Sequence, residues 1–464
     1  MIATSRIRTL LAGAIALALL PLTQAADLST AYTQAVERDP QLKVAAASRD
    51  AAQEGIQLAR ARLLPQLSGS AELTRTNSDS LDTERFPDGE GVVLRQVPSE
   101  TETDGRGFSF RLDQTIYDHS NYTQLNAARA SAARAEAQYQ AALQQLAVRV
   151  AEAYFAMLTA EDSVRFARAD EMAVTRQLEQ AEQRFNVGLT AITDVHEARA
   201  RRDSATAAAI LAENALDDAR EALAEITGNF VEAVKPLREN IPLEPPAPNV
   251  WQDWVKLAMD GNPEVQAALL ASEAADFQIQ TARAGHYPTL SAFASYTDSE
   301  RDSDTTILGS LTSTSNPVKN DTIGIRLSVP IFSGFSVSSR VRQSVAEHQV
   351  TLDQQEQTRR AVTRQTRNAF RAILAGISEV KARQQALVSA QSALDATQAG
   401  FEVGTRTIVD VLLSQQVLVQ AQRDYSRARH DFVVNGLRLK RAAGTIAESD
   451  IQTINALLEE RPAS

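Results

Sequence analysis

The chain repeats one structural pattern in its two halves, and this duplication constrains the fold more than any other feature. The segments 39–42 and 64–67 recur as 262–265 and 287–290, in each case 223 positions later. Further along, the glycine-containing segment 185–190 recurs as 401–406, now at an offset of 216 positions. A period this long exceeds that of solenoid repeats and indicates duplication of a whole structural unit. We therefore predict two equivalent copies, residues 26–245 and 246–464, each with a helix, two strands, a long helix and a further helix.

The first 25 residues have the pattern of a secretory signal peptide. Arg6 and Arg8 precede an apolar run from Leu10 to Leu20, and small residues follow up to Ala25. The run is too short to cross a bilayer as a helix, so we expect cleavage and no membrane anchor. The chain has no cysteine, which excludes disulfides and thiolate catalysis. Its formal net charge of −11 argues against nucleic-acid partners.

A long helix is predicted in each half. Residues 121–187 contain neither proline nor glycine, and small or apolar side chains recur there at alternating steps of four and three. This heptad seam favours a coiled coil over an ordinary surface helix. At 1.5 Å per residue, the helix would be about 100 Å long, so two shorter helices, 41–63 and 190–228, could pair with it end to end. The seam recurs between Val362 and Phe401, where Gly376 and Arg383 interrupt it.

Four segments with the alternation of β-strands lie between these helices. Pro65 and Pro288 each end a helix, and about ten residues after each alternate between an apolar and a polar face. The polar stretches 77–104 and 299–320 are predicted to be mobile loops. An isolated hairpin is barely stable, and transmembrane barrels need about eight strands. Several chains should therefore build one barrel, with polar faces inward around a water-filled pore.

Particular segments of the chain resemble one known family. The segments 184–195 and 403–412, together with 64–67 and 226–228, are similar to those of the outer-membrane efflux proteins, the outer membrane factors. The resemblance covers essentially the whole chain after the signal peptide. It implies a membrane β-barrel plus a long α-helical coiled-coil barrel: a homotrimer with a 12-stranded outer-membrane barrel, four strands per chain, continued by a periplasmic tunnel.

The resemblance also implies a function and partners. The family serves as an exit duct in the cell outer membrane for tripartite efflux or type I secretion. Its members contact outer-membrane lipid, dock to a periplasmic adaptor, and work with an inner-membrane pump of the RND, ABC or MFS type. Their cargo includes drugs, bile salts and polypeptides. No cofactor or metal is expected.

The sequence favours neither of two other classes of protein. An enzyme is not indicated, because the five histidines are scattered and neither a phosphate-binding loop nor a serine elbow is present. A soluble periplasmic coiled-coil scaffold or adhesin stalk would explain the heptads and the acidity. It would not explain four alternating segments at matching points of the two copies.

Both long helices end at a Val-Gly pair, and these two turns are candidate functional sites. Glycine permits the left-handed cap that reverses a helix, so plain capping is one interpretation. The resemblance implies a second one, in which the turns contact the adaptor. The positions that match this contact are Arg184, Gly188, Leu189, Gly404 and Thr405.

Just past these turns lie positions that hold the entrance of the tunnel closed in the family. They are the gating positions Thr193, Asp194 and Arg406, and Asp410 at the narrowest point; Phe401, a fourth gating position, lies just before the second turn. Two residues depart from the family pattern. A tyrosine often stands where this chain has Phe401, and a second aspartate where it has Leu413. The equivalent of Leu413 in the first copy is Glu197, which either replaces the missing acid or simply faces the periplasm.

Overall fold

The computed structural model describes residues 26–89 and 91–459, so the predicted signal peptide lies outside the described residues. The chain divides into two compact units. The first comprises Met1–Lys43, Ala142–Asp260 and Arg364–Ser464, and the second comprises Val44–Ala141 and Gly261–Thr363. The elements, in chain order, are α1 (Leu28–Arg38), α2 (Pro40–Ala61), β1 (Gln66–Asp88), β2 (Gly91–Tyr117), α3 (His119–Asn186), α4 (Ile192–Thr227), α5 (Trp251–Gly261), α6 (Pro263–Ala284), β3 (Thr289–Ile307), β4 (Ser310–Ser328), α7 (Ser336–Glu402), α8 (Ile408–Ala442) and α9 (Glu448–Asn455).

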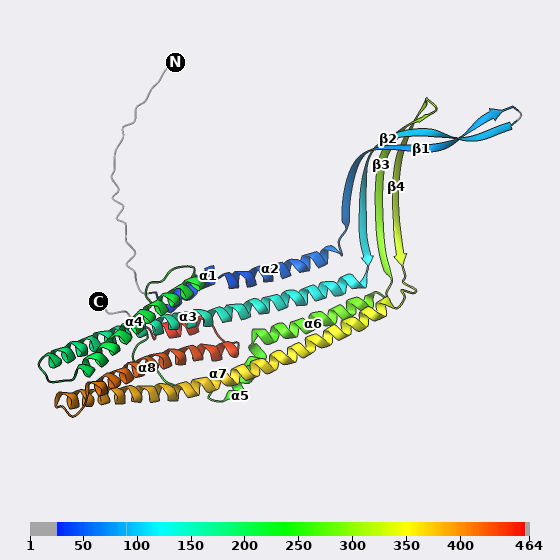
Figure 1. Cartoon of the computed structure of the whole chain (residues 1–464). Helices are drawn as coiled ribbons and strands as arrows, with labels where there is room; N and C mark the ends of the chain where they lie inside the picture. Colours follow the sequence, from blue (N-terminus) through cyan, green and yellow to red (C-terminus); the bar gives the residue numbers. More distant parts are fainter. Residues whose placement is uncertain (1–25, 90, 460–464) are drawn as a thin grey trace, which may run out of the picture. The chain divides into compact units, whose positions relative to one another are not determined.

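The second unit contains a sheet of four antiparallel strands in the order β1-β2-β3-β4. Figure 1 shows the strands side by side, with the β1–β2 hairpin extending beyond the turn that joins β3 to β4. Pairing of β2 with β3 stops at Ser99 and Ile307, so the outer part of β1 and β2 is a two-stranded ribbon. Leu308 and Gly309 form the β3–β4 turn with φ angles of 50° and 81°.

The prediction that residues 77–104 and 299–320 form mobile loops is wrong. The strands continue through both stretches, and they are 19 to 27 residues long, where about ten were predicted. The prediction failed because both faces of the strands become polar there, so the alternation of apolar and polar residues disappears. Threonine is frequent in these stretches, and its branched side chain favours extended backbone.

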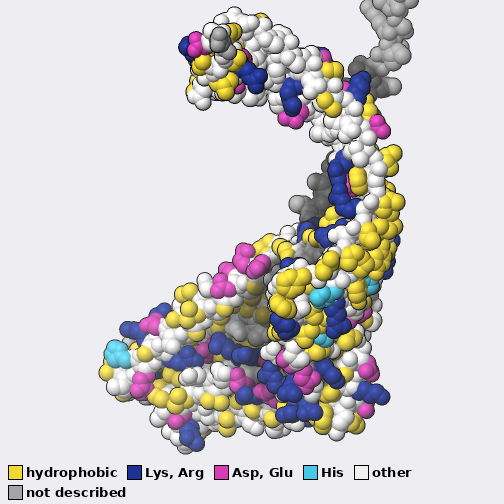
Figure 2. All heavy atoms as spheres, turned by 90° about the vertical axis from the view of Figure 1, so that its right-hand side faces the viewer, with side chains coloured by type: hydrophobic (Ala, Val, Ile, Leu, Met, Phe, Trp, Pro, Cys, Tyr) yellow, Lys and Arg dark blue, Asp and Glu magenta, His cyan; other side chains and the backbone are white. Residues whose placement is uncertain are grey.

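The two faces of the sheet differ in chemistry. Leu67, Leu112, Ala294 and Ile323 form one apolar row across all four strands. Figure 2 shows hydrophobic side chains gathered along the part of the strands next to the helices. Beyond this band the same face becomes charged, as in the ion pair between Arg75 and Asp104. The opposite face is mostly polar in the band, with Phe293 as an exception; the row next to the apolar one consists of Ser68, Arg111, Ser295 and Thr322.

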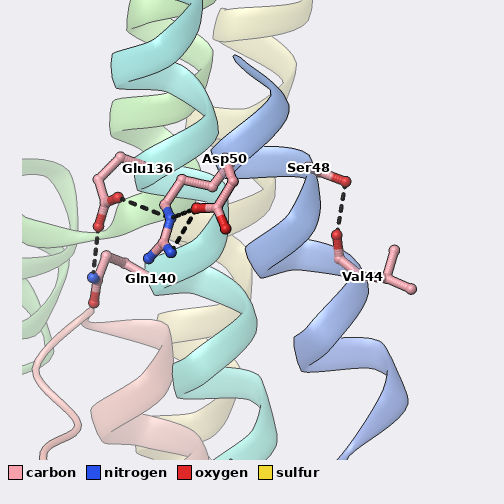
Figure 3. Close-up of polar contacts among 6 residues, drawn as sticks. Val44, Ser48, Asp50, Glu136 and Gln140 are labelled. Atoms are coloured by element: carbon pink, nitrogen blue, oxygen red, sulfur yellow. Dashed lines mark hydrogen bonds and ion pairs between the residues drawn. The ribbon is translucent and has the colours of Figure 1, made fainter. Parts of the chain in front are cut away.

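Polar contacts join the helices of the second unit. Figure 3 shows Glu136 and Gln140 of α3 opposite Asp50 of α2. Arg49 lies between the two helices, 2.8 Å from Asp50 and 3.9 Å from Glu136. Its guanidinium also lies 4.5 Å from the centroid of the Tyr139 ring. Such exposed pairs orient the helices and stabilise them only slightly.

The predicted coiled-coil seam is largely buried. On α3 the buried seam positions include Leu146, Val150, Met157 and Val174. On α7, Val362, Thr366, Ile373, Gly376, Val380, Ala390 and Leu394 are buried, as the 216-residue offset predicts. Within residues 26–89 and 91–459, no helix is both long enough and apolar enough to span a bilayer.

Three residues of the first unit, two of which interrupt the predicted seam, have identifiable structural roles. Arg383, which interrupts the predicted seam, is exposed and forms an ion pair of 2.8 Å with Asp424 on α8. A side chain at Gly376 would lie 3.3 Å from the Phe432 ring, so glycine lets α7 and α8 approach closely. Trp254 is buried on α5, and its Nε1 donates to the carbonyl of Pro248.

His430 is a buried titratable side chain between α3 and α8. Its Nδ1 lies 2.8 Å from Thr159 Oγ1, and its ring packs against Phe155 with centroids 5.6 Å apart. The pKa of His430 is lowered from 6.5 to about 4, chiefly by burial and to a smaller extent by the neighbouring Arg429, while Asp162 opposes the shift. The imidazole is therefore neutral in the folded protein at neutral pH.

This depressed pKa predicts a loss of stability in mild acid. In the unfolded chain, His430 binds a proton as the pH falls below 6.5. In the folded protein it remains unprotonated until about pH 4. The free energy of unfolding should therefore fall by about 3 kcal/mol per chain across this window. In His430→Gln, the thermal unfolding temperature should depend less on pH between 6.5 and 4. An equally steep pH dependence in the variant would contradict the assignment.

Candidate functional site

The candidate site lies in the first unit, at the ends of the α3–α4 and α7–α8 hairpins. Gly188 and Gly404 have φ angles of 77° and 81°, the left-handed conformation predicted for them. Each turn closes with equivalent backbone hydrogen bonds. The Leu189 amide donates to the Arg184 carbonyl and the Thr405 amide to the Gly400 carbonyl, both at 2.8 Å. The two copies therefore build the same helical reversal.

An apolar cluster joins the two hairpins behind the turns. Val174, Leu178 and Ala181 of α3 and Val195 and Ala198 of α4 are buried against Ile408 and Leu412 of α8. Phe401 packs against this cluster and also against the one between α7 and α8 that contains Leu394 and Val411. Phe401 is thus a contact shared by both hairpins.

Arg184 contacts Phe401 directly. Its guanidinium lies 4.7 Å from the centroid of the Phe401 ring, a cation–π contact across the two hairpins. The sequence had suggested Arg184 only as an adaptor contact. Leu189 and Val403 are 71% and 76% exposed at the turns, so each hairpin end carries an exposed apolar side chain.

Asp194 and Asp410 each form local hydrogen bonds at the start of the second helix of their hairpin. Asp194 accepts a hydrogen bond from the Thr190 hydroxyl. Asp410 accepts from the Thr407 amide and hydroxyl at 2.9 and 3.0 Å, which completes a capping box on α8. These bonds, together with the nearby positive charge of Arg406, hold the pKa of Asp410 below 3.8.

The gating positions are only partly brought together within one chain. The side chain of Arg406 lies against Gly400, where a Cβ would be 2.7 Å from Arg406 Cγ. In the part of the chain that the structure describes, this side chain makes no hydrogen bond or ion pair. The predicted links to Thr193 and Asp194 are therefore not formed inside a single chain. Glu197 and Leu413 are both exposed.

Sequence reasoning missed two ion pairs that fix the hairpins. Arg201 of α4 lies 2.7 Å from the nearly buried Asp170 of α3, and Arg199 lies 2.8 Å from Glu182. Removing one partner from a buried pair leaves an uncompensated charge, so Asp170 and Arg201 constrain how α3 and α4 pack. No local pattern indicates such pairs, because the partners lie on different helices.

The chain is similar over most of its length to proteins of one known family. The sequence profile of the family described as outer membrane efflux protein matches residues 31–229 and 254–445, which is most of each copy. The chain is 36% identical over 436 residues to the outer membrane protein TolC of Vibrio cholerae, covering 94% of each chain. The chain belongs to the outer membrane efflux protein family. The internal duplication predicted from the sequence is therefore confirmed.

Other relatives and a solved structure support the same conclusion. The chain is 28% identical over 462 residues to the alkaline protease secretion protein AprF of Pseudomonas aeruginosa, covering 99% of this chain and 93% of that protein. The crystal structure of the outer membrane protein VceC of Vibrio cholerae has a TM-score of 0.68 at 21% identity, covering 90% and 96% of the two chains. That likeness shows that the two chains share a fold.

Family membership confirms several predictions made from the sequence. This efflux-family protein is an exit duct of the outer membrane, with four strands per chain and long helices. The soluble stalk is thereby excluded as the alternative. The family consists of channel proteins, which gives no support to an enzymatic role.

Proposed function

We propose that three copies of this chain close a 12-stranded barrel in the outer membrane and continue it as a helical tunnel in the periplasm. The observation that carries this proposal is the four-stranded sheet with one apolar face. Four strands cannot close a transmembrane barrel, and an apolar face of this extent needs lipid to cover it. Three chains supply twelve strands, and the polar faces then line the pore. The copies 26–245 and 246–464 would alternate around the tunnel.

The hairpin ends are the proposed docking surface for a periplasmic adaptor that connects the duct to an inner-membrane pump. The exposed apolar side chains at the two turns, with Gly188, Gly404 and Thr405 between them, support this proposal. RND, ABC and MFS pumps are the candidate types. Relatives named as TolC and as a protease secretion protein leave both small molecules and polypeptides as cargo.

Site-specific crosslinking tests the docking surface. The chain has no cysteine, so one introduced thiol is unique. We expect Leu189→Cys, carrying a thiol-linked photocrosslinker, to capture an adaptor of helical-hairpin type in cells. The matched control Leu257→Cys, on α5 and also exposed, should not capture it. Equal capture from both positions would contradict docking at the turns.

The entrance to the tunnel is proposed to lie at the same hairpin ends, where Asp410 recurs three times in the trimer. Carboxylates crowded around a narrow mouth concentrate cations there. Because the pKa of Asp410 is depressed, its charge should persist to a pH below 3.8. Phe401 lacks the hydroxyl that would bond to Asp194, so one closing bond, worth about 0.5–1.5 kcal/mol, is absent.

Block by multivalent cations from the periplasmic side tests whether Glu197 replaces the acid missing at Leu413. We expect Asp410→Asn to weaken the block in planar bilayers. If Glu197 contributes, Glu197→Gln should weaken the block further on the Asp410→Asn background. If Glu197→Gln has no effect alone or in the double variant, Glu197 faces the periplasm and the entrance has one acidic ring.

A further inference from the structure

A polar cavity lies within the second unit, where β3 and β4 meet α3, α6 and α7. Its volume is about 620 Å³, and most of the side chains that line it are hydroxyls, amides or charged groups. Tyr287 contributes an aromatic wall, since its ring packs edge-on against His119 with centroids 5.3 Å apart. Arg340 of α7 also lines the cavity. Figure 1 shows this junction between the strands and the helices.

The cavity is continuous with the polar face of the sheet. Thr289 and Ser328 line it and pair with each other at the first row of β3 and β4. The next residue on the same face of β4 is Arg326, because side chains two apart along a strand share a face. In the proposed barrel this face points into the pore, so the cavity would open to passing cargo.

An aromatic side chain lies on the polar face of the sheet, four residues along β3 from Thr289, which lines the cavity. Phe293 lies over Gly324 of the neighbouring strand, where a Cβ would be 2.7 Å from the ring. Only glycine at position 324 leaves room for the ring to lie against the wall. The Arg326 guanidinium lies 5.0 Å from the centroid of the Phe293 ring, which holds the charge beside an aromatic surface.

The two arginines have no carboxylate bound to them in the described part of the chain, although two acids lie nearby. Asp113, on the same face, is already bonded to Arg111 at 2.6 and 2.9 Å. Asp118, which lines the cavity, accepts from the amide and hydroxyl of Ser120. The guanidinium groups of Arg326 and Arg340 are therefore free to bind an anion.

We propose that this junction binds aromatic organic anions as they pass through the duct. Arg326 and Arg340 would bind the sulfonate or carboxylate group by charge-assisted hydrogen bonds, and Phe293 and Tyr287 would contact the ring system. This inference rests on the proposed trimeric barrel, since only there does the polar face line a pore.

Channel block by naphthalene-1,5-disulfonate tests the proposal with the full-length protein in planar bilayers. Losing one charge-assisted hydrogen bond should weaken block by about tenfold to a hundredfold in Arg326→Gln and in Arg340→Gln. Arg342→Gln is the matched control, because Arg342 lies about 200° around α7 from Arg340 and contacts Ser339. Its block constant should stay within about twofold of the unsubstituted protein.

Two further variants test the aromatic contribution. Phe293→Leu and Tyr287→Leu should each weaken block by the disulfonate about two- to tenfold, and should not change any effect of inorganic sulfate. Sulfate that blocks as tightly as the disulfonate would overturn the proposal, since simple anion attraction would suffice. A conducting channel whose block is unchanged in both arginine variants would overturn this site alone. If the unsubstituted protein forms no channels in planar bilayers, the proposed function is contradicted as well.

Discussion

Replacing one residue on the apolar face of the sheet, Ile325→Arg, should nearly abolish the protein in the outer membrane. Ile325 is 71% exposed in a single chain, so the substitution removes little packing within it. In the barrel, an arginine facing the middle of the bilayer costs about 2–4 kcal/mol, and three chains contribute one each. The measurement is the amount of folded trimer in outer-membrane fractions, separated on gels without heating.

The control for this variant is Thr322→Arg, which lies three residues away on the same strand but on the polar face. An arginine there would face the water-filled pore, where Arg111 and Arg326 already lie. The level of trimer should therefore remain close to that of the unsubstituted protein. Equal levels of Ile325→Arg and Thr322→Arg would contradict the assignment of the two faces.

Removing one charge at the hairpin ends, Arg406→Ala, should open the entrance. The Arg406 side chain has no hydrogen-bonding or ionic partner within the described part of its own chain, so it is available to a neighbouring copy. The gating links to Thr193 and Asp194 would then form between chains. A charge-assisted bond of about 1.5–3 kcal/mol implies an open fraction about 10 to 100 times higher without it. Single-channel conductance in planar bilayers should rise, and cells should become sensitive to large antibiotics.

Arg427→Ala provides the comparison for this gating variant. Arg427 is an exposed residue of α8, paired with Asp431 at 3.5 Å four residues along. Its removal changes the net charge by the same amount without affecting the hairpin ends. Its conductance should match that of the unsubstituted channel. Unchanged conductance in Arg406→Ala would mean that Arg406 is only a solvated charge.

The helical part of the fold was predictable because its signal is periodic and local. The seam from Leu146 to Ala181 and its copy from Val362 to Leu394 are largely buried as the heptad pattern predicts. The reversal at Gly188 and Gly404 was predictable because a left-handed cap favours glycine. The strands were recognised only where one face is apolar, so their polar outer halves were mistaken for loops.

Several features of the candidate site depend on tertiary contacts and could not be predicted from the sequence. The contact of Arg184 with Phe401 joins two hairpins that are more than 200 residues apart in the chain. The pairing of Asp170 with Arg201 likewise depends on how two helices pack. The capping box of Asp410 did have a signal, a threonine three residues before an acid, which could have identified it. Contacts between copies of the chain cannot be derived from the sequence or structure of a single copy.

The central claim is that three copies of the chain form one transmembrane channel. Native mass spectrometry of the detergent-purified mature protein tests it most directly, because it counts the chains in the particle that also conducts in bilayers. We expect a detergent-dependent particle with the mass of three chains. A particle of two chains, or a monomer that stays soluble without detergent, would contradict the 12-stranded barrel and the function built on it.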